Sequence, residues 1–158
     1  MYQNFVNLKG RINLKVFDSF GNLKDEEDIN NVIVNVGKAV VAGRILDDVT
    51  SAQAQPFDFI ALGTNNTAAA ATQTTLGAEI TTGGGERSSA SGSRVLTNVA
   101  SDTAQLINTF NFTSTFSIVE SGIFNDANSG DMLARQTFTA KNVNNGDSLQ
   151  VTWKVTVS

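Results

Sequence analysis

The side chains of this sequence that could carry out acid–base chemistry are its carboxylates, because the chain contains no histidine and no cysteine. Without histidine the commonest general base is missing, and Ser–His–Asp catalysis is excluded. Without cysteine there is no thiolate nucleophile, no disulfide and no cysteine-based metal site. A pair such as Asp58 and Glu120 could still act as the two acids of a glycosidase. Nothing else points to a reaction, so we predict no catalytic residue and a protein that is not an enzyme.

A short segment near the C-terminus has the oxygen donors of a calcium loop. The donors are Asp126, Asn128 and Asp131. The glycine such a loop needs comes one position early, at Gly130, and the distal bidentate glutamate is missing. The segment is dense in turn-forming residues, so we predict a hairpin turn and no metal site.

Two other clusters have plainer explanations than ligand binding. Gly83, Gly84 and Gly85 resemble a phosphate-cradling loop, but no Gly-Lys-Ser/Thr sequence follows them. The acidic run Asp25–Asp28 could gather a cation, but such a run between two strands is typical of a solvated bend. We therefore predict no bound cofactor.

The charge balance limits the partners. Lysine and arginine total 11 and aspartate and glutamate 15, and no basic stretch occurs, so nucleic-acid binding is not expected. No apolar run approaches the ~20 residues of a membrane span, and the N-terminal sequence lacks the pattern of a signal peptide. We expect a soluble protein made in the cytoplasm. The sole tyrosine, Tyr2, and the sole tryptophan, Trp153, give little of the aromatic platform typical of sugar binding.

The elements that position these residues are mainly strands. Apolar and polar residues alternate over 8–16 and 149–157, which predicts half-buried strands near both ends of the chain. Asp18–Gly21 reads as the turn of a hairpin whose second strand covers 29–36. Further strands are predicted over 57–62, 94–99, 106–116 (with Phe110, Phe112 and Phe116 facing one way), 119–125 and 132–140.

One helix is predicted over 37–49. Val41, Ile45 and Val49 would form its apolar face, and Asn35 could cap its start. About eight strands around one helix predict a mainly β, antiparallel β-sandwich, because a single sheet of that size would leave one apolar face in water. The length predicts a single domain, 1–158.

The low-complexity tract 64–93 is predicted to be an extended loop or arm. Leu76 and Ile80 are its only large apolar residues, so it cannot form a core alone, and it far exceeds an ordinary connection. We expect it to fold against a neighbouring copy and to make the chain a homo-oligomer. The predicted partner-contact residues are Leu76, Ile80, Gly83, Gly84, Gly85, Glu86 and Arg87.

Several segments together resemble small structural proteins of tailed bacteriophages. These segments are Phe59-Ile60-Ala61-Leu62-Gly63-Thr64, Thr75-Leu76-Gly77-Ala78-Glu79-Ile80, Ile118-Val119-Glu120-Ser121-Gly122-Ile123-Phe124-Asn125, Met132-Leu133-Ala134-Arg135 and Gly146-Asp147-Ser148-Leu149 with Val151-Thr152-Trp153. The resemblance covers most of the chain. The sequence departs from the pattern of these proteins in the tract 64–93, which has no proline among its alanines.

The resemblance implies a virion structural protein. Within that class we expect a capsid decoration, or cement, protein that binds the major capsid protein on the outer surface of the phage head, most simply as a trimer. A tail or tail-fibre component is the first alternative. A carbohydrate-binding β-sandwich module is the second, and exposed aromatic residues in a cleft would favour it.

Overall fold

The computed structural model describes residues 6–158, so Tyr2 lies outside the described residues. One helix and ten strands occur among them. In chain order they are β1 Leu8–Phe17, β2 Leu23–Asn30, β3 Val32–Ile33, α1 Asn35–Leu46, β4 Phe59–Gly63, β5 Ser88–Ser89, β6 Ser91–Val95, β7 Thr103–Asn111, β8 Phe116–Phe124, β9 Met132–Val143 and β10 Ser148–Val157.

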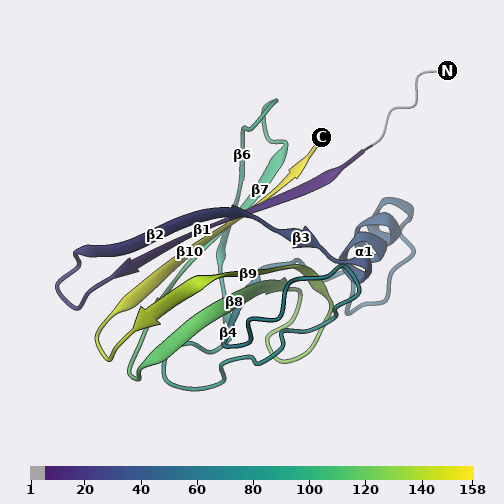
Figure 1. The fold of residues 1–158 in the computed structure, drawn as a ribbon. Helices are drawn as coiled ribbons and strands as arrows, with labels where there is room; N and C mark the ends of the chain where they lie inside the picture. Colours follow the sequence, from purple (N-terminus) through teal and green to yellow (C-terminus); the bar gives the residue numbers. More distant parts are fainter. Residues whose placement is uncertain (1–5) are drawn as a thin grey trace.

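The strands form two five-stranded antiparallel sheets, here called sheet A and sheet B. The strand order is β2-β1-β10-β7-β6 in sheet A and β3-β9-β8-β4-β5 in sheet B. The two sheets lie over one another, with α1 at one side of sheet B (Figure 1). This arrangement confirms the predicted antiparallel β-sandwich with one short helix.

The core lies between the two sheets and is built by the alternation seen in the sequence. In β1 the residues Ile12, Leu14 and Val16 are buried, and β10 pairs with β1 along its whole length. Trp153, in the middle of β10, is fully buried, and its indole Nε1–H donates a hydrogen bond of 3.2 Å to Ser121 Oγ in sheet B. The predicted strands near both ends of the chain are therefore confirmed, and together they form the centre of sheet A.

The second strand of the predicted hairpin lies earlier in the chain than expected. The turn forms as predicted, because Asp18 accepts hydrogen bonds from the backbone N–H groups of Phe20 and Asn22. The strand that follows is β2, which contains the whole acidic run Asp25–Asp28. The predicted strand over 29–36 is wrong, because those residues end β2, form β3 in the other sheet and begin α1.

The helix also differs from its prediction. It starts at Asn35, and Val34 occupies the N-cap position without a side-chain hydrogen bond, so the predicted Asn35 cap is wrong. The helix packs through Gly37 and Val40. Gly37 lies so close to the β9 backbone that a side chain there would collide. The predicted apolar residue Ile45 is 80% exposed. No helix within residues 6–158 is long and apolar enough to cross a membrane.

The predicted strand over 106–116 is two strands. The chain leaves β7 at Asn111, turns, and enters β8 at Phe116. Phe112 therefore lies in the turn, yet it is 2% exposed, and its ring centroid is 6.0 Å from that of Phe116. The aromatic residues reach the core as expected, but from two strands and their connection rather than from one face of one strand.

The remaining predicted strands are found with small shifts. Those over 57–62, 119–125 and 132–140 correspond to β4, β8 and β9. The strand predicted over 94–99 is β6, which ends at Val95. It ends there because the carboxylate of Asp102 accepts hydrogen bonds from the next backbone N–H groups, which come from Thr97, Asn98 and Val99.

Candidate functional site

The tract 64–93 is ordered against its own domain. Leu76 and Ile80 are 7% and 5% exposed, and both belong to the core. A backbone bridge joins Gly63 to Glu79, and Ile80 N–H donates to the Leu62 carbonyl at 2.8 Å. The prediction that Leu76 and Ile80 anchor the tract on a neighbouring copy is therefore corrected. Their apolar surface is already covered by the sandwich.

A buried ion pair holds the first half of the tract. Glu120 on β8 and Arg135 on β9 are both fully buried, and their closest N–O distance is 2.6 Å. The Glu120 carboxylate also accepts backbone N–H bonds of 3.2, 3.0 and 2.8 Å from Asn65, Gly77 and Ala78. We call this group the Glu120 clamp.

Arg135 completes the Glu120 clamp from the other side. Its Nη1 donates to the Thr67 carbonyl at 3.0 Å and to Gln73 Oε1 at 2.9 Å. Every charged atom of the pair therefore has a partner, which is what makes a buried ion pair tolerable in a protein interior. The arrangement fixes the path of the chain over residues 65–78.

The Glu120 clamp is not half of a two-carboxylate active site. Glu120 lies opposite Gly63 in the β4–β8 register, whereas Asp58 precedes Phe59 at the far end of β4. Five residues of extended chain separate the two positions by ~17 Å. Glycosidase carboxyl groups lie at most ~9.5 Å apart, so the pairing of Asp58 with Glu120 considered from the sequence is wrong.

Arg87 fastens the second half of the tract. Its guanidinium makes two hydrogen bonds with Glu79, of 2.8 and 2.7 Å, and lies 3.6 Å from the ring centroid of Phe124. It also donates to the carbonyls of Asp126 and Ser129 in the β8–β9 turn. With a side chain only 7% exposed, Arg87 connects two parts of its own chain.

The glycine run packs the tract against the β7–β8 connection. Gly83 and Gly84 have φ values of +74° and +89°, which favour glycine. A Cβ at Gly84 would lie 2.0 Å from the Asn111 carbonyl oxygen, and Gly83 accepts a 2.9 Å hydrogen bond from Thr113 N–H. Of the predicted contact residues in the tract, Glu86 is the exposed one.

The β8–β9 connection is a hairpin turn, as predicted. Asp126 Oδ1 accepts hydrogen bonds from the backbone N–H groups of Asn128 and Ser129, and these bonds lower the pKa of Asp126. Asn125 Oδ1 accepts from Asp131 N–H at 2.7 Å. Of the three predicted donors, Asp126 thus uses its carboxylate to stabilise the turn itself. Residues 6–158 contain no cluster of three potential metal ligands.

The acidic run forms the edge strand β2 and binds the other sheet. Asp25 and Glu27 point inward, and each carboxylate lies 2.8 Å from Lys141 Nζ on β9. Burial disfavours the charge of Lys141, but the hydrogen bonds to the two carboxylates outweigh it and raise the lysine pKa. The predicted solvated bend is therefore corrected. Inward charges on an edge strand also hinder pairing with another chain.

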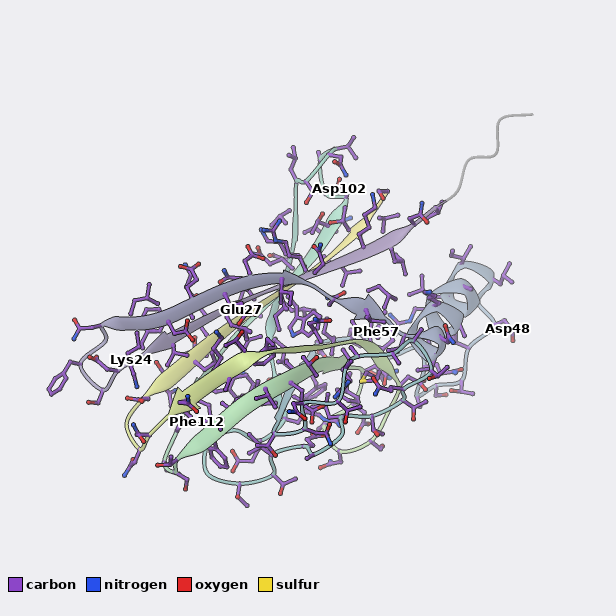
Figure 2. All side chains as sticks on the ribbon, in the orientation of Figure 1. Lys24, Glu27, Asp48, Phe57, Asp102 and Phe112 are labelled. Atoms are coloured by element: carbon purple, nitrogen blue, oxygen red, sulfur yellow. The ribbon has the colours of Figure 1, made fainter. Side chains whose placement is uncertain are left out.

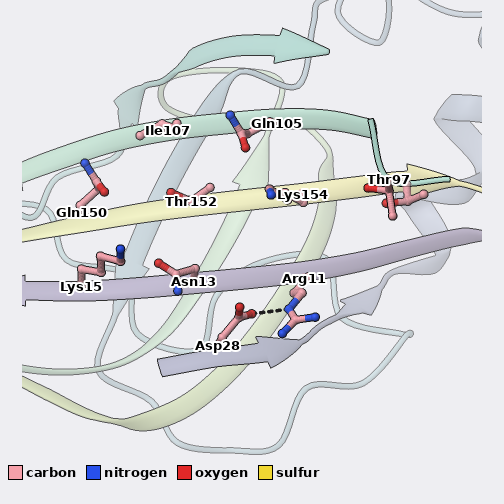
Figure 3. A pocket seen from close by; sticks show the side chains of 11 residues that line it. Arg11, Asn13, Lys15, Asp28, Thr97, Gln105, Ile107, Gln150, Thr152 and Lys154 are labelled. Atoms are coloured by element: carbon pink, nitrogen blue, oxygen red, sulfur yellow. Dashed lines mark hydrogen bonds and ion pairs between the residues drawn. The ribbon is translucent and has the colours of Figure 1, made fainter. Parts of the chain in front are cut away.

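A shallow polar groove of about 590 Å³ covers the outer face of sheet A (Figure 3). It runs across β1, β10 and β7, and its polar floor contains amide, hydroxyl and charged side chains. None of the described residues lining it is aromatic. The lining residues are Arg11, Asn13, Lys15, Asp28, Thr97, Gln105, Ile107, Gln150, Thr152, Lys154 and Thr156.

One end of sheet A offers a different surface, which we call the open end. It comprises the edge strand β6 and four exposed apolar residues, Val6, Leu96, Val99 and Val157. These share an end because Val157 N–H donates to the Asp102 carbonyl and Asn7, next to Val6, donates its N–H to the Ser158 carbonyl. Figure 2 shows Asp102 in the β6–β7 connection beyond the two sheets.

The edge strand β6 lacks the protection of the other edges. Four of its five residues are exposed and its single charge is Arg94. Edge strand β2 carries inward carboxylates, whereas β3 and β5 have only two residues each. Among the described strands, β6 is the edge best able to accept another strand.

Sequence reasoning missed the Glu120 clamp and the open end. The clamp residues all lie in or beside segments that carry the phage resemblance, so co-occurrence of those segments was the available signal. The open end had no such signal, because its exposure depends on how far sheet A extends. Comparison of the chain with protein-family models, curated proteins and solved structures gives no match.

Proposed function

We propose that this chain is a virion structural protein of the capsid decoration type, which docks on the outer surface of an assembled phage head. The open end is the observation that carries the proposal. An unpaired strand edge beside exposed apolar side chains is a surface that a second protein completes by strand addition and apolar burial. We assign this surface to contact with the major capsid protein.

The buried charges support a structural role. The Glu120 clamp, the Arg87–Glu79 pair and the group of Lys141 with Asp25 and Glu27 join separate segments of the chain and pair their charges within the fold. Such pairs resist rearrangement, because removing one partner leaves a buried charge uncompensated. Buried charges that are paired within their own domain suit a component that stays on a particle.

The segments behind the resemblance also support one structural unit. Glu120, Arg135 and Gly77 come from three of those segments and meet in the Glu120 clamp. The segments that resemble phage structural proteins therefore contain residues that hold the fold together. Homotrimers remain part of the proposal, and the tract 64–93 can contribute to them only through its exposed residues, such as Glu86.

Labelling of intact virions tests the proposal. An antibody against this chain is applied to particles of the phage that encodes it, and gold labels are counted on heads and tails by electron microscopy. We expect labels over the head surface. Labels confined to the tail would support a tail or tail-fibre component instead, and intact particles without the chain, checked by mass spectrometry, would contradict both assignments.

A further inference from the structure

The outer face of sheet A is a basic area on an acidic protein. Lys9, Arg11, Lys15 and Lys154 face outward from β1 and β10, where they alternate with buried core residues. Two carboxylates, Glu26 and Asp28, face the same side from the edge strand β2. The whole chain carries a formal charge of −4, so this face has the opposite sign to the rest of the surface.

The strand register places two cations directly opposite each other. Arg11 pairs with Lys154 across β1 and β10, and Lys154 pairs with Gln105 across β10 and β7. Like charges at directly opposed positions destabilise a sheet. Asp28 neutralises Arg11 from its other side, but Lys154 forms no ion pair with any residue in 6–158. Lys154 is therefore the cation of this row that lacks a counter-charge among the described residues, and an anion bound beside it would supply one.

The rest of the groove provides hydrogen-bonding groups. Asn13 and Thr152 form the next outward row, and Lys15 and Gln150 form the one after it. The Arg11 and Lys15 rows are four residues, or ~14 Å, apart along β1. Ile107 is the single large apolar residue that lines the groove within the described part of the chain.

We infer that this groove is a binding site for an acidic oligosaccharide. A carboxylate of the sugar would lie between Arg11 and Lys154, and neighbouring hydroxyls would bond to Gln105, Gln150 and Asn13. A protein partner would require an apolar centre in its interface, and a nucleic-acid strand would require clustered lysine and arginine along its phosphates. The described groove residues form no such centre, and the carboxylates of β2 already pair with two of the three groove cations. The site goes beyond the proposed docking role and does not depend on it.

Titrations of the ¹⁵N-labelled full chain, followed by NMR, test the site. The probes are hexasaccharides of galacturonate, of mannuronate and of hyaluronan, at concentrations up to about 10 mM. The fully methyl-esterified galacturonate hexamer is the matched neutral control, and a hexaglutamate peptide is the matched acidic control without sugar. We expect at least one acidic sugar to shift amide signals of β1, β10 and β7. Its binding should weaken at about 0.5 M salt, and both controls should bind less tightly.

Three single-residue variants locate the contact. Lys154→Gln should weaken binding by about tenfold, because it removes one charge-assisted hydrogen bond. Gln105→Ala should weaken it by a smaller factor, through loss of a hydroxyl contact. Lys38→Gln, which removes an exposed cation on α1, should leave the affinity unchanged.

Three results would overturn the inference. One is no shift with any of the acidic sugars, and another is shifts outside sheet A. The third is equally tight binding of hexaglutamate, which would assign the basic face to an acidic protein surface. Melting curves of each variant show whether it is folded, so that loss of binding is not confused with loss of structure.

Discussion

At the scale of single residues, Trp153 links the two sheets more directly than any other large side chain of β10. It is fully buried and donates its indole N–H to Ser121 on the opposite sheet. We expect Trp153→Ala to lower the free energy of unfolding by ~3–5 kcal/mol, as measured by urea denaturation. Trp153→Phe keeps most of the volume and loses the hydrogen bond, so it should cost only ~1–2 kcal/mol. An alanine variant as stable as the parent would refute this role.

The role of Glu120 can be tested in the tract 64–93, whose backbone it binds. In Glu120→Gln the carboxylate charge is lost while Arg135 stays buried, and such half-broken pairs cost ~3–5 kcal/mol. Amide hydrogen exchange should accelerate at Asn65, Gly77 and Ala78, whose N–H groups bond to the carboxylate. Glu86→Gln changes an exposed carboxylate of the same tract and serves as the control. Equal exchange in the two variants would show that the Glu120 clamp does not hold the tract.

Asp102 gives the chain a specific response to acid. The backbone N–H of Val99, followed by those of Asn98 and Thr97, hydrogen bonds to its carboxylate and lowers its pKa to about 2. Because an unfolded aspartate titrates near ~3.9, this stabilisation is complete above pH ~4 and is lost as the pH falls towards 2.

The Asp102 response is measured by a carbon-detected NMR titration of the carboxyl group. We expect a midpoint of about 2 and, over the same pH interval, faster amide exchange at residues 97–99. In Asp102→Asn the exchange at these amides should be fast at every pH. A midpoint near ~3.9 would mean that the turn does not hold the carboxylate.

At the scale of elements, the tract 64–93 belongs to the fold. Replacing residues 67–85 by a short Gly/Ser linker removes Leu76 and Ile80 from the core and deprives Glu120 of two backbone donors. We therefore expect this variant to lose its cooperative thermal transition, followed by circular dichroism. A second variant keeps residues 76–80 and replaces only residues 67–72, by a Gly/Ser segment of the same length. This variant should remain folded. A cooperative transition in the first variant would show that the tract is dispensable.

The sequence predicted elements well where one pattern decides the structure. In β1 and β10 apolar and polar residues alternate, which indicates one buried and one solvent-exposed face, and both strands lie where expected. The acidic run of β2 was misjudged because its partner, Lys141, is 116 residues from Asp25 along the chain. The helix face was misjudged for a similar reason, since it depends on which part of sheet B lies beneath Gly37.

The candidate sites were harder to predict than the strands. Leu76 and Ile80 were expected to anchor the tract on a neighbouring copy, and they pack in the core of their own domain instead. Sequence alone does not say which of the two an apolar residue will contact. The open end and the groove are both products of strand register and of the extent of sheet A. Exposed polar residues such as Lys154 have no local signal that distinguishes them from ordinary surface.

At the scale of the whole molecule, different surfaces have different properties. The sandwich interior and the tract are held by buried apolar residues and charge pairs, the outer face of sheet A is basic, and the open end is apolar with an unprotected edge. Because these surfaces are separate, the open end can be altered without changing the core or the basic face. Gly92 lies on β6, and a Cβ built there meets no atom within 4 Å.

The most direct test of the docking role is co-sedimentation with phage heads that lack this chain. The wild-type chain is compared with Gly92→Lys, which adds a charge to the β6 edge, and with Ala39→Lys, which adds the same charge to an exposed position of α1. We expect wild type and Ala39→Lys to pellet with the heads, whereas Gly92→Lys stays in the supernatant with an unchanged melting temperature. Pelleting of Gly92→Lys as complete as that of wild type, or no pelleting of wild type, would contradict the docking role.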